Sequence, residues 1–110
     1  MLEIYHLVLK SVWEANPDQP YVADSLSAEG FIHCSFAEQV AWAANRFYAD
    51  QQDLLVLYID PARLTSPVRE ETSGSSERFP HVYGPINRDA VVAMQPLQRD
   101  ANGRWEFAKQ

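Results

Sequence analysis

Apolar residues lie along this chain in short runs, which polar and turn-forming stretches separate. Residues 2–9, LEIYHLVL, alternate poorly but are rich in aliphatic, β-branched and aromatic side chains, as is typical of a strand covered on both faces. Residues 53–60, DLLVLYID, form the most apolar run, and we expect a central strand there. Shorter runs at 31–34, 67–71 and 91–95 predict further strands.

One segment, residues 36–50, has the periodicity of a long helix. Its apolar side chains recur at intervals of three and four residues, at Phe36, Val40, Ala43 and Phe47. Ser35 and Glu38 have the spacing of a capping box, which predicts that the helix begins there. A second box, at Ser11 and Glu14, predicts a helix of one to two turns that the following NPDQP ends.

Turn signals divide the remaining sequence. Residues 21–30 are polar and predict a loop with one helical turn, which Gly30 ends in a left-handed conformation. Residues 72–77, TSGSSE, predict a flexible surface loop. Residues 78–86 are extended because each proline disfavours helix in the residue before it. Residues 96–107 predict two strands joined by an Asn-Gly turn.

These elements predict an α+β fold with several short strands, one long helix and one or two short helices. The chain has 110 residues, of which 46% are apolar and 22% are charged, and this composition excludes a disordered chain. A chain of that length is near the common size of one domain and can bury a core without disulfides or metal. We therefore expect a single domain over residues 1–110.

Charge and cysteine content narrow the class of protein. The net charge is −6 and the nine basic residues are scattered, which makes nucleic acid an improbable partner unless a local basic patch forms. One cysteine cannot form an intrachain disulfide, and the N-terminus has no secretion signal, so we expect a cytoplasmic protein. No apolar run approaches the roughly 20 residues that span a bilayer. Oligomeric state cannot be inferred from these features.

The three histidines, His6, His33 and His81, all fall in strand-like or extended segments, and we expect them to line one pocket. Each could instead be a half-buried side chain bonded to backbone. Three imidazoles can also bind zinc, which leaves a metal hydrolase open as a minor alternative. The chain has no His-x-His, His-Glu-x-x-His or Cys-x-x-Cys pattern, and we expect no metal.

Strand alternation divides the segment around His33 between two faces. His33 and Ser35 share one face, and Cys34 points to the other, where a buried cysteine is at home. Ser35 can cap the following helix and also contact an anionic ligand at the helix start.

Three further residues are candidates for a site. Glu71 ends a predicted strand, where it either points inward or forms a surface pair with Glu70. Arg69 is a candidate phosphate ligand or a surface charge. Tyr83 shares a strand face with His81 and places an aromatic ring beside an imidazole.

Motifs spread over residues 4–97 resemble a small bacterial family, domain of unknown function 952. Among them are YHLV, DSLSAEGFIHCS, LLVLYIDPARL, VREE and FPHVYGPI, in this order. That family is grouped with the ADP-ribosyltransferase-like fold. The resemblance therefore implies a split β-sheet that holds NAD in its cleft.

The resemblance also implies roles for individual residues. His6 in YHLV matches the motif that binds the adenosine ribose, and His33 and Ser35 in FIHCS match the motif on the nicotinamide side. Glu71 matches the glutamate that acts on the nicotinamide ribose, although no Gln-x-Glu or Glu-x-Glu pattern surrounds it. A related branch transfers a 2′-phosphate from RNA to NAD without this glutamate.

The leading functional hypothesis is an enzyme that acts on NAD or another nucleotide, as a glycosyl- or phosphotransferase. Glu71 and His33 would be catalytic, and His6, Ser35, Arg69, His81 and Tyr83 would bind the ligand. A second hypothesis is a non-catalytic module that binds a nucleotide-like ligand in the same cleft.

Overall fold

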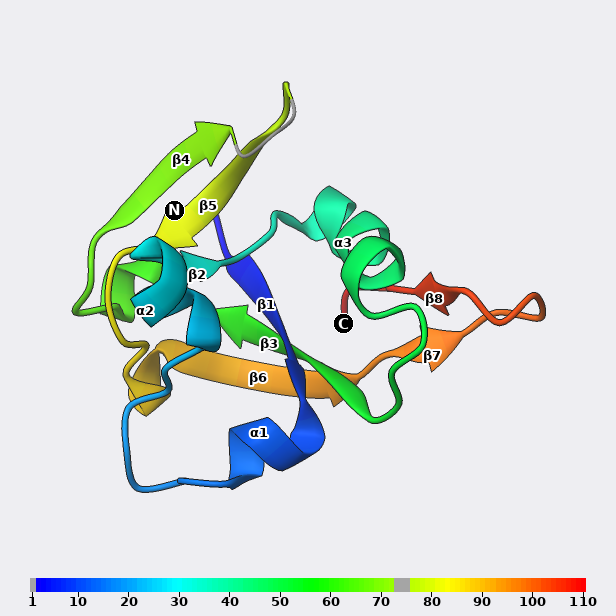
Figure 1. Ribbon diagram of the computed structural model, residues 1–110, viewed down its shortest axis with the longest axis horizontal. Helices are drawn as coiled ribbons and strands as arrows, with labels where there is room; N and C mark the ends of the chain where they lie inside the picture. The colour runs from blue at the N-terminus through cyan, green and yellow to red at the C-terminus, as the bar shows by residue number, and fades with distance from the viewer. Residues whose placement is uncertain (1, 73–75) are drawn as a thin grey trace.

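The computed structural model describes residues 2–72 and 76–110, which form two three-stranded antiparallel sheets and a small hairpin (Figure 1). The first sheet consists, in spatial order, of β1 (Ile4–Leu9), β3 (Leu54–Ile59) and β6 (Val91–Pro96). The second sheet consists of β2 (Ile32–His33), β5 (Arg78–Val82) and β4 (Val68–Thr72). The hairpin pairs β7 (Gln98–Arg99) with β8 (Trp105–Glu106).

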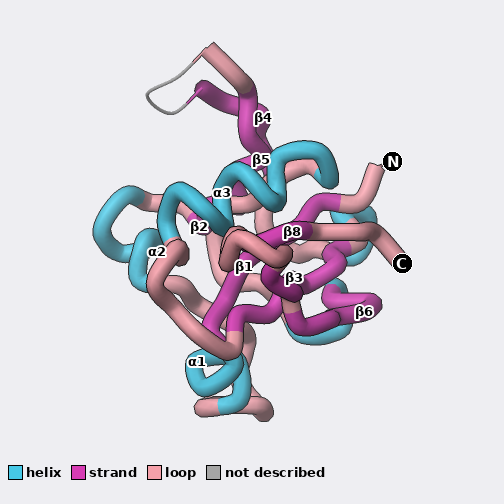
Figure 2. The backbone as a smooth tube through the Cα atoms, turned by 90° about the vertical axis from the view of Figure 1, so that its right-hand side faces the viewer, coloured by secondary structure: helices cyan, strands magenta, loops and turns pink. Residues whose placement is uncertain are grey.

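The helices are short. They are α1 (Lys10–Glu14), α2 (Asp24–Glu29) and α3 (Val40–Phe47), with 3₁₀ turns η1 (Ala37–Gln39), η2 (Pro61–Arg63) and η3 (Arg88–Ala90). Helix α3 packs on one face of the first sheet. Figures 1 and 2 show how the helices are arranged around the strands. The predicted α+β class is confirmed. No helix in the described ranges combines the length and the apolar content that crossing a membrane requires.

Strand β3 separates two apolar clusters, as expected for a central strand. All of its residues are buried, and their side chains alternate between the two faces of the first sheet. Leu55, Leu57 and Ile59 join the cluster that includes Ile32 and Val82 of the second sheet. The other face carries the cluster that α3 and the β7–β8 hairpin cover.

Buried His6 joins the two sheets. Its Nδ1 donates to the carbonyl oxygen of His33 at 2.6 Å, and the hydroxyl of Tyr21 donates to its Nε2 at 2.8 Å. Beside it, the backbones of Tyr5 and Ser35 pair through two hydrogen bonds of 2.7 and 2.8 Å. A carbonyl oxygen only accepts, so the single proton of a neutral His6 lies on Nδ1. Burial lowers the pKa of His6 to about 4.

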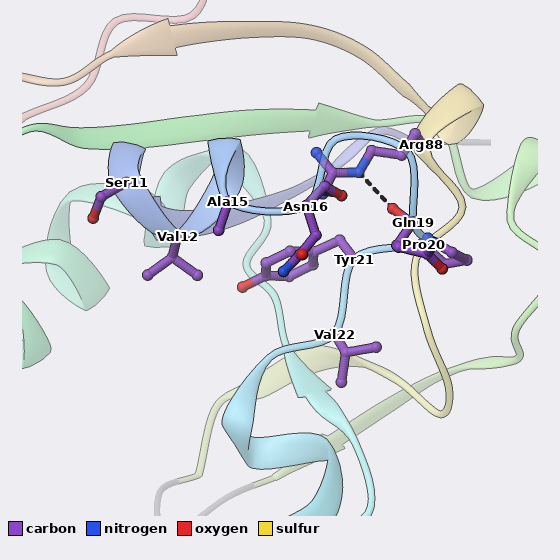
Figure 3. A pocket seen from close by; sticks show the side chains of 9 residues that line it. All are labelled: Ser11, Val12, Ala15, Asn16, Gln19, Pro20, Tyr21, Val22 and Arg88. Atoms are coloured by element: carbon purple, nitrogen blue, oxygen red, sulfur yellow. Dashed lines mark hydrogen bonds between the residues drawn. The ribbon is translucent and has the colours of Figure 1, made fainter.

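Arg88 fixes the loop between α1 and α2. Its guanidinium donates to the carbonyl oxygens of Trp13, Asn16 and Gln19 at 2.8–2.9 Å. The same group lies 4.1 Å above the centre of the Trp13 ring. Figure 3 shows Arg88 reaching over this loop, with its bond to Gln19. The backbone carbonyl groups of this loop, which has no regular secondary structure, thereby gain hydrogen-bond donors.

Neither predicted capping box forms. Helix α1 begins at Lys10, and its N-terminus has no side-chain cap. Ser35 cannot begin a helix because its backbone pairs with β1 in an extended conformation. The helical segment begins at Ala37, where the side chain of Gln39 accepts from the Phe36 amide at 3.0 Å.

The turn predicted at Gly30 is confirmed. Gly30 has φ = +90° and ends α2, as predicted. Glycine has no Cβ, so Gly30 adopts this left-handed conformation without a steric penalty, and the chain turns from α2 toward β2. The helix expected over 36–50 is helical from 37 to 47. Residues 73–75 of the loop predicted at 72–77 lie outside the described residues.

The His6 joint predicts a dependence of stability on pH. His6 is neutral in the fold but takes up a proton near pH 6.5 when unfolded, so protonation favours the unfolded chain. The free energy of unfolding should be full above about pH 6.5 and fall by roughly 3 kcal/mol as the pH drops to about 4. Urea unfolding across this range measures it. In His6→Asn, which keeps a donor toward His33, the dependence should flatten. An unchanged slope would show that His6 is not the group responsible.

The Arg88 contacts predict a cost for removing the guanidinium. Arg88→Met should lower the free energy of unfolding by about 1–3 kcal/mol, because three carbonyl oxygens lose a charged donor. Arg63→Met is the matched control, since Arg63 is exposed and makes one long ion pair with Asp60, at 3.6 Å. That control should change stability by less than about 1 kcal/mol. Equal effects of the two substitutions in thermal unfolding would contradict the role of Arg88.

Candidate functional site

The two faces of the second sheet have different chemistry. Ile32, Val68 and Val82 point into the apolar core. Because side chains alternate along a strand, the neighbours of these residues point to the opposite face. His33 and His81 are register partners there, and their ring centroids are 5.3 Å apart.

A hydrogen-bond network on this face centres on Glu71. One carboxylate oxygen, Oε1, accepts from His81 Nδ1 at 2.9 Å and from the Tyr83 hydroxyl at 2.5 Å. The hydrogen bond from Tyr83, followed by that from His81, lowers the pKa of Glu71. The same bond raises the pKa of Tyr83. The second oxygen, Oε2, accepts no hydrogen bond from a described residue, so a charged oxygen remains free for another partner.

His81 has one ring nitrogen in use and one without a partner. The residue is 1% exposed, and its Nε2 makes no hydrogen bond within the described ranges. The Phe31 ring stacks on the imidazole at 4.0 Å and 17°. Since Glu71 takes the proton on Nδ1, Nε2 of a neutral His81 is an acceptor. Such an orphaned buried atom is uncommon and requires an explanation.

His33 is more exposed than His81. Its Nε2 lies 2.9 Å from a carboxylate oxygen of Glu29, the last residue of α2. The Phe31 ring packs edge-on against the imidazole, with centroids 4.9 Å apart. The side chains of His33 and Glu29 are each about half exposed, 46% and 48%, so both reach solvent.

A cleft of about 620 Å³ opens between α3 and the strands that carry the histidines. This volume is typical of sites for small molecules. The lining residues are His6, Leu7, Glu29, His33, Cys34, Ser35, Trp42, Ala43, Phe47, Tyr48, Phe79 and His81. All three histidines thus line one cleft, as the sequence predicts.

The other predicted site residues occupy different positions around this cleft. Ser35 is buried in its wall. Glu71 and Tyr83 adjoin it through the network on His81. Arg69 is exposed and lies over the Tyr83 ring, 5.0 Å from its centre, beyond the lining residues. Cys34 is buried in the core as expected, and burial raises the pKa of its thiol. The ligand-binding and catalytic roles of these residues stay predictions.

The sequence did not identify the aromatic part of the cleft. Helical spacing groups Phe47 with Phe36, Val40 and Ala43 on one apolar stripe, whereas Trp42 lies off that stripe. In the structure, Trp42 is 51% exposed and Phe47 is 65% exposed. Phe47 emerges because α3 ends there, so the side chain lies beyond the sheet that buries Val40 and Ala43. The sequence signal for this part of the cleft is Trp42 itself, a large aromatic residue outside the apolar stripe of the helix.

The described part of the chain gives weaker support to a metal site and to a second small-molecule site. No group of three His, Cys, Asp or Glu side chains there could hold a metal ion. A second hollow, of about 440 Å³, lies between the α1–α2 loop and Arg88 (Figure 3). The guanidinium of Arg88 is already bonded to that loop. The histidine-lined cleft is therefore the main candidate site.

Comparison with known proteins places the chain in a family. The model of a family described as protein of unknown function, DUF952, matches residues 7–94. The crystal structure of protein CC0527 from Caulobacter crescentus is similar, with 29% identity, a TM-score of 0.84, and coverage of 94% of this chain and 93% of that one. The solution structure of CC0527 has 29% identity and a TM-score of 0.77, with coverage of 94% and 91%. No curated protein matches. The chain belongs to the DUF952 family.

Proposed function

We propose that the cleft binds NAD or a related nucleotide and that the protein is a transferase acting on it, built on a split sheet of the ADP-ribosyltransferase-like type. The observation that carries this proposal is His81. Its buried Nε2 has no hydrogen-bond partner among the described residues, and its other nitrogen is held by the carboxylate of Glu71. A ribose hydroxyl is a donor of the kind that this atom requires.

The free oxygen of Glu71 supplies the chemistry. Cleavage of the bond between nicotinamide and ribose develops positive charge on the ribose, as in glycoside hydrolysis. A carboxylate close to that carbon stabilises the charge, and its interaction is strongest in the transition state. Tyr83 and His81 both bind Oε1, which leaves Oε2 to meet the sugar.

The order of side chains along β4 and β5 supports an extended ligand. Glu71 is the register partner of Phe79, and Arg69 is the register partner of His81. A ring near Phe79, a ribose near Glu71 and His81, and a phosphate toward Arg69 would follow one direction along the strands. Arg69 is exposed, and its contact over the Tyr83 ring leaves the guanidinium open to solvent and to such a phosphate.

A non-catalytic module that binds the same ligand is the second candidate. It is favoured by the use of Glu71 Oε1 in two internal hydrogen bonds, which gives the carboxylate a role in holding His81 and Tyr83. In that case the network positions side chains for binding and no bond of the ligand is broken.

Glu71→Gln separates the two candidates. Glutamine keeps an acceptor for Tyr83 and His81 but removes the charge. Binding of NAD, measured by calorimetry, should change little, whereas nicotinamide release should fall by most of its value. Glu70→Gln is the matched control, since the side chain of that neighbour points to the other face of β4, and it should leave both quantities unchanged. Wild-type protein that binds NAD and releases no nicotinamide would support the binding module instead.

His33→Ala should act on binding itself. Loss of the imidazole should weaken NAD binding by about 1–3 kcal/mol if a polar group of the ligand that is buried in the complex is left unpaired. Calorimetry at constant pH measures the effect, with the melting temperature of the free protein as the control for folding. Unchanged affinity would remove His33 from the proposed site.

A further inference from the structure

The mouth of the cleft carries large aromatic side chains that are left in solvent. Trp42 and Phe47 are more than half exposed, and their rings meet edge to face with centroids 6.0 Å apart. Trp42 also lies 5.7 Å from the ring of Phe79 on β5. Contiguous exposed aromatic surface of this kind commonly marks a binding site. Here it adjoins the buried, unpartnered Nε2 of His81.

Among the described residues that line the cleft the charged side chain is acidic, whereas Arg46 brings a positive charge to the Phe47 ring from outside that lining. The described residues that line the cleft include no lysine or arginine. Glu29 contributes a half-exposed carboxylate, and His81 contributes an acceptor nitrogen. Glu71 adjoins the cleft through its hydrogen bond to His81, and the hydrogen bonds from Tyr83 and His81 lower its pKa. The nearest basic side chain on α3 is Arg46, which already lies over the Phe47 ring at 5.5 Å.

We infer that Trp42 and Phe79 form a subsite for a flat organic cation, with Phe47 packed edge-on against Trp42 and the Glu29 carboxylate, which also contacts His33, as the counter-charge in the same cleft. An aromatic face attracts a cation through its quadrupole, and tryptophan does so best. A flat ring can also lie against the tryptophan by offset stacking, which a spherical cation cannot do.

The same features disfavour an anionic group in this part of the cleft. A phosphate would face Glu29 and would find no lysine or arginine among the described lining residues. The subsite for a flat cation does not depend on the proposed NAD-binding function, although NAD⁺ is one ligand that fits it. NAD⁺ carries a pyridinium ring, whereas NADH carries the same phosphates and a neutral ring. If the cleft binds NAD⁺, its pyridinium ring lies in this subsite, and this assignment rests on the proposed function.

Pairs of ligands that differ in ring charge test the subsite. The permanent cation 1-methylnicotinamide is compared with neutral nicotinamide, and NAD⁺ with NADH, by calorimetry on the whole chain. Each cation should bind about two- to fivefold more tightly than its neutral counterpart, as expected of a cation–π contact at a half-exposed ring. Trp42→Leu should remove most of this preference. Met94→Ala is the matched control, because Met94 is equally exposed, at 51%, on β6 away from the cleft.

Glu29→Gln gives a second test that leaves every ring in place. It should weaken binding of 1-methylnicotinamide severalfold and leave nicotinamide unchanged, and the residue is exposed enough that folding is not at risk. Equal affinity for cation and neutral ligand, or a preference that survives Trp42→Leu, overturns the inference. If NAD⁺ and NADH bind equally, the proposed function survives and the subsite does not. If 1-methylnicotinamide binds while neither dinucleotide does, the subsite stands and the proposed function fails.

Discussion

The two hydrogen bonds of buried His6 hold together the parts of this protein that form its cleft. The imidazole lies on the first sheet, donates to the backbone of the second and accepts from Tyr21 in the loop before α2. The paired backbones of Tyr5 and Ser35 fix the same junction. His33 and Ser35, which line the cleft, lie in the segment held by these bonds. Because burial favours the neutral form of His6 and both of its nitrogens are bonded, its proton has one position in this joint.

Position along a strand decides which of the three histidines is free to meet a ligand. Both ring nitrogens of His6 are used within the fold, so this residue supports the cleft wall. His33 pairs with Glu29 at the surface and can exchange that partner. His81 combines a nitrogen held by Glu71 with one that has no partner in residues 2–72 and 76–110. The cleft therefore contains one structural histidine and two with capacity for a ligand.

Local rules predicted much of the fold and part of the site. Apolar runs located the strands, alternation separated His33 from Cys34, and Gly30 marked the end of α2. The capping boxes misled, because pairing of Ser35 with β1 is a tertiary contact that overrides a local preference. Nothing in the sequence fixes the register of β4 against β5, and so the bonding of Glu71 to His81 could not be foreseen. The contact of Arg88 with Trp13 joins residues too distant in sequence for any local pattern.

Nitrogen NMR of the imidazole rings, recorded near neutral pH before and after addition of NAD⁺, tests the central claim most directly. His6 should show its proton on Nδ1 in both spectra, as its two hydrogen bonds require. The Nε2 resonance of His81 should lie at the position of an unbonded acceptor in the free protein and shift to that of a bonded one in the complex. If His81 Nε2 keeps its resonance while NAD⁺ is bound, the ligand does not use this atom, and the cleft is not organised around it.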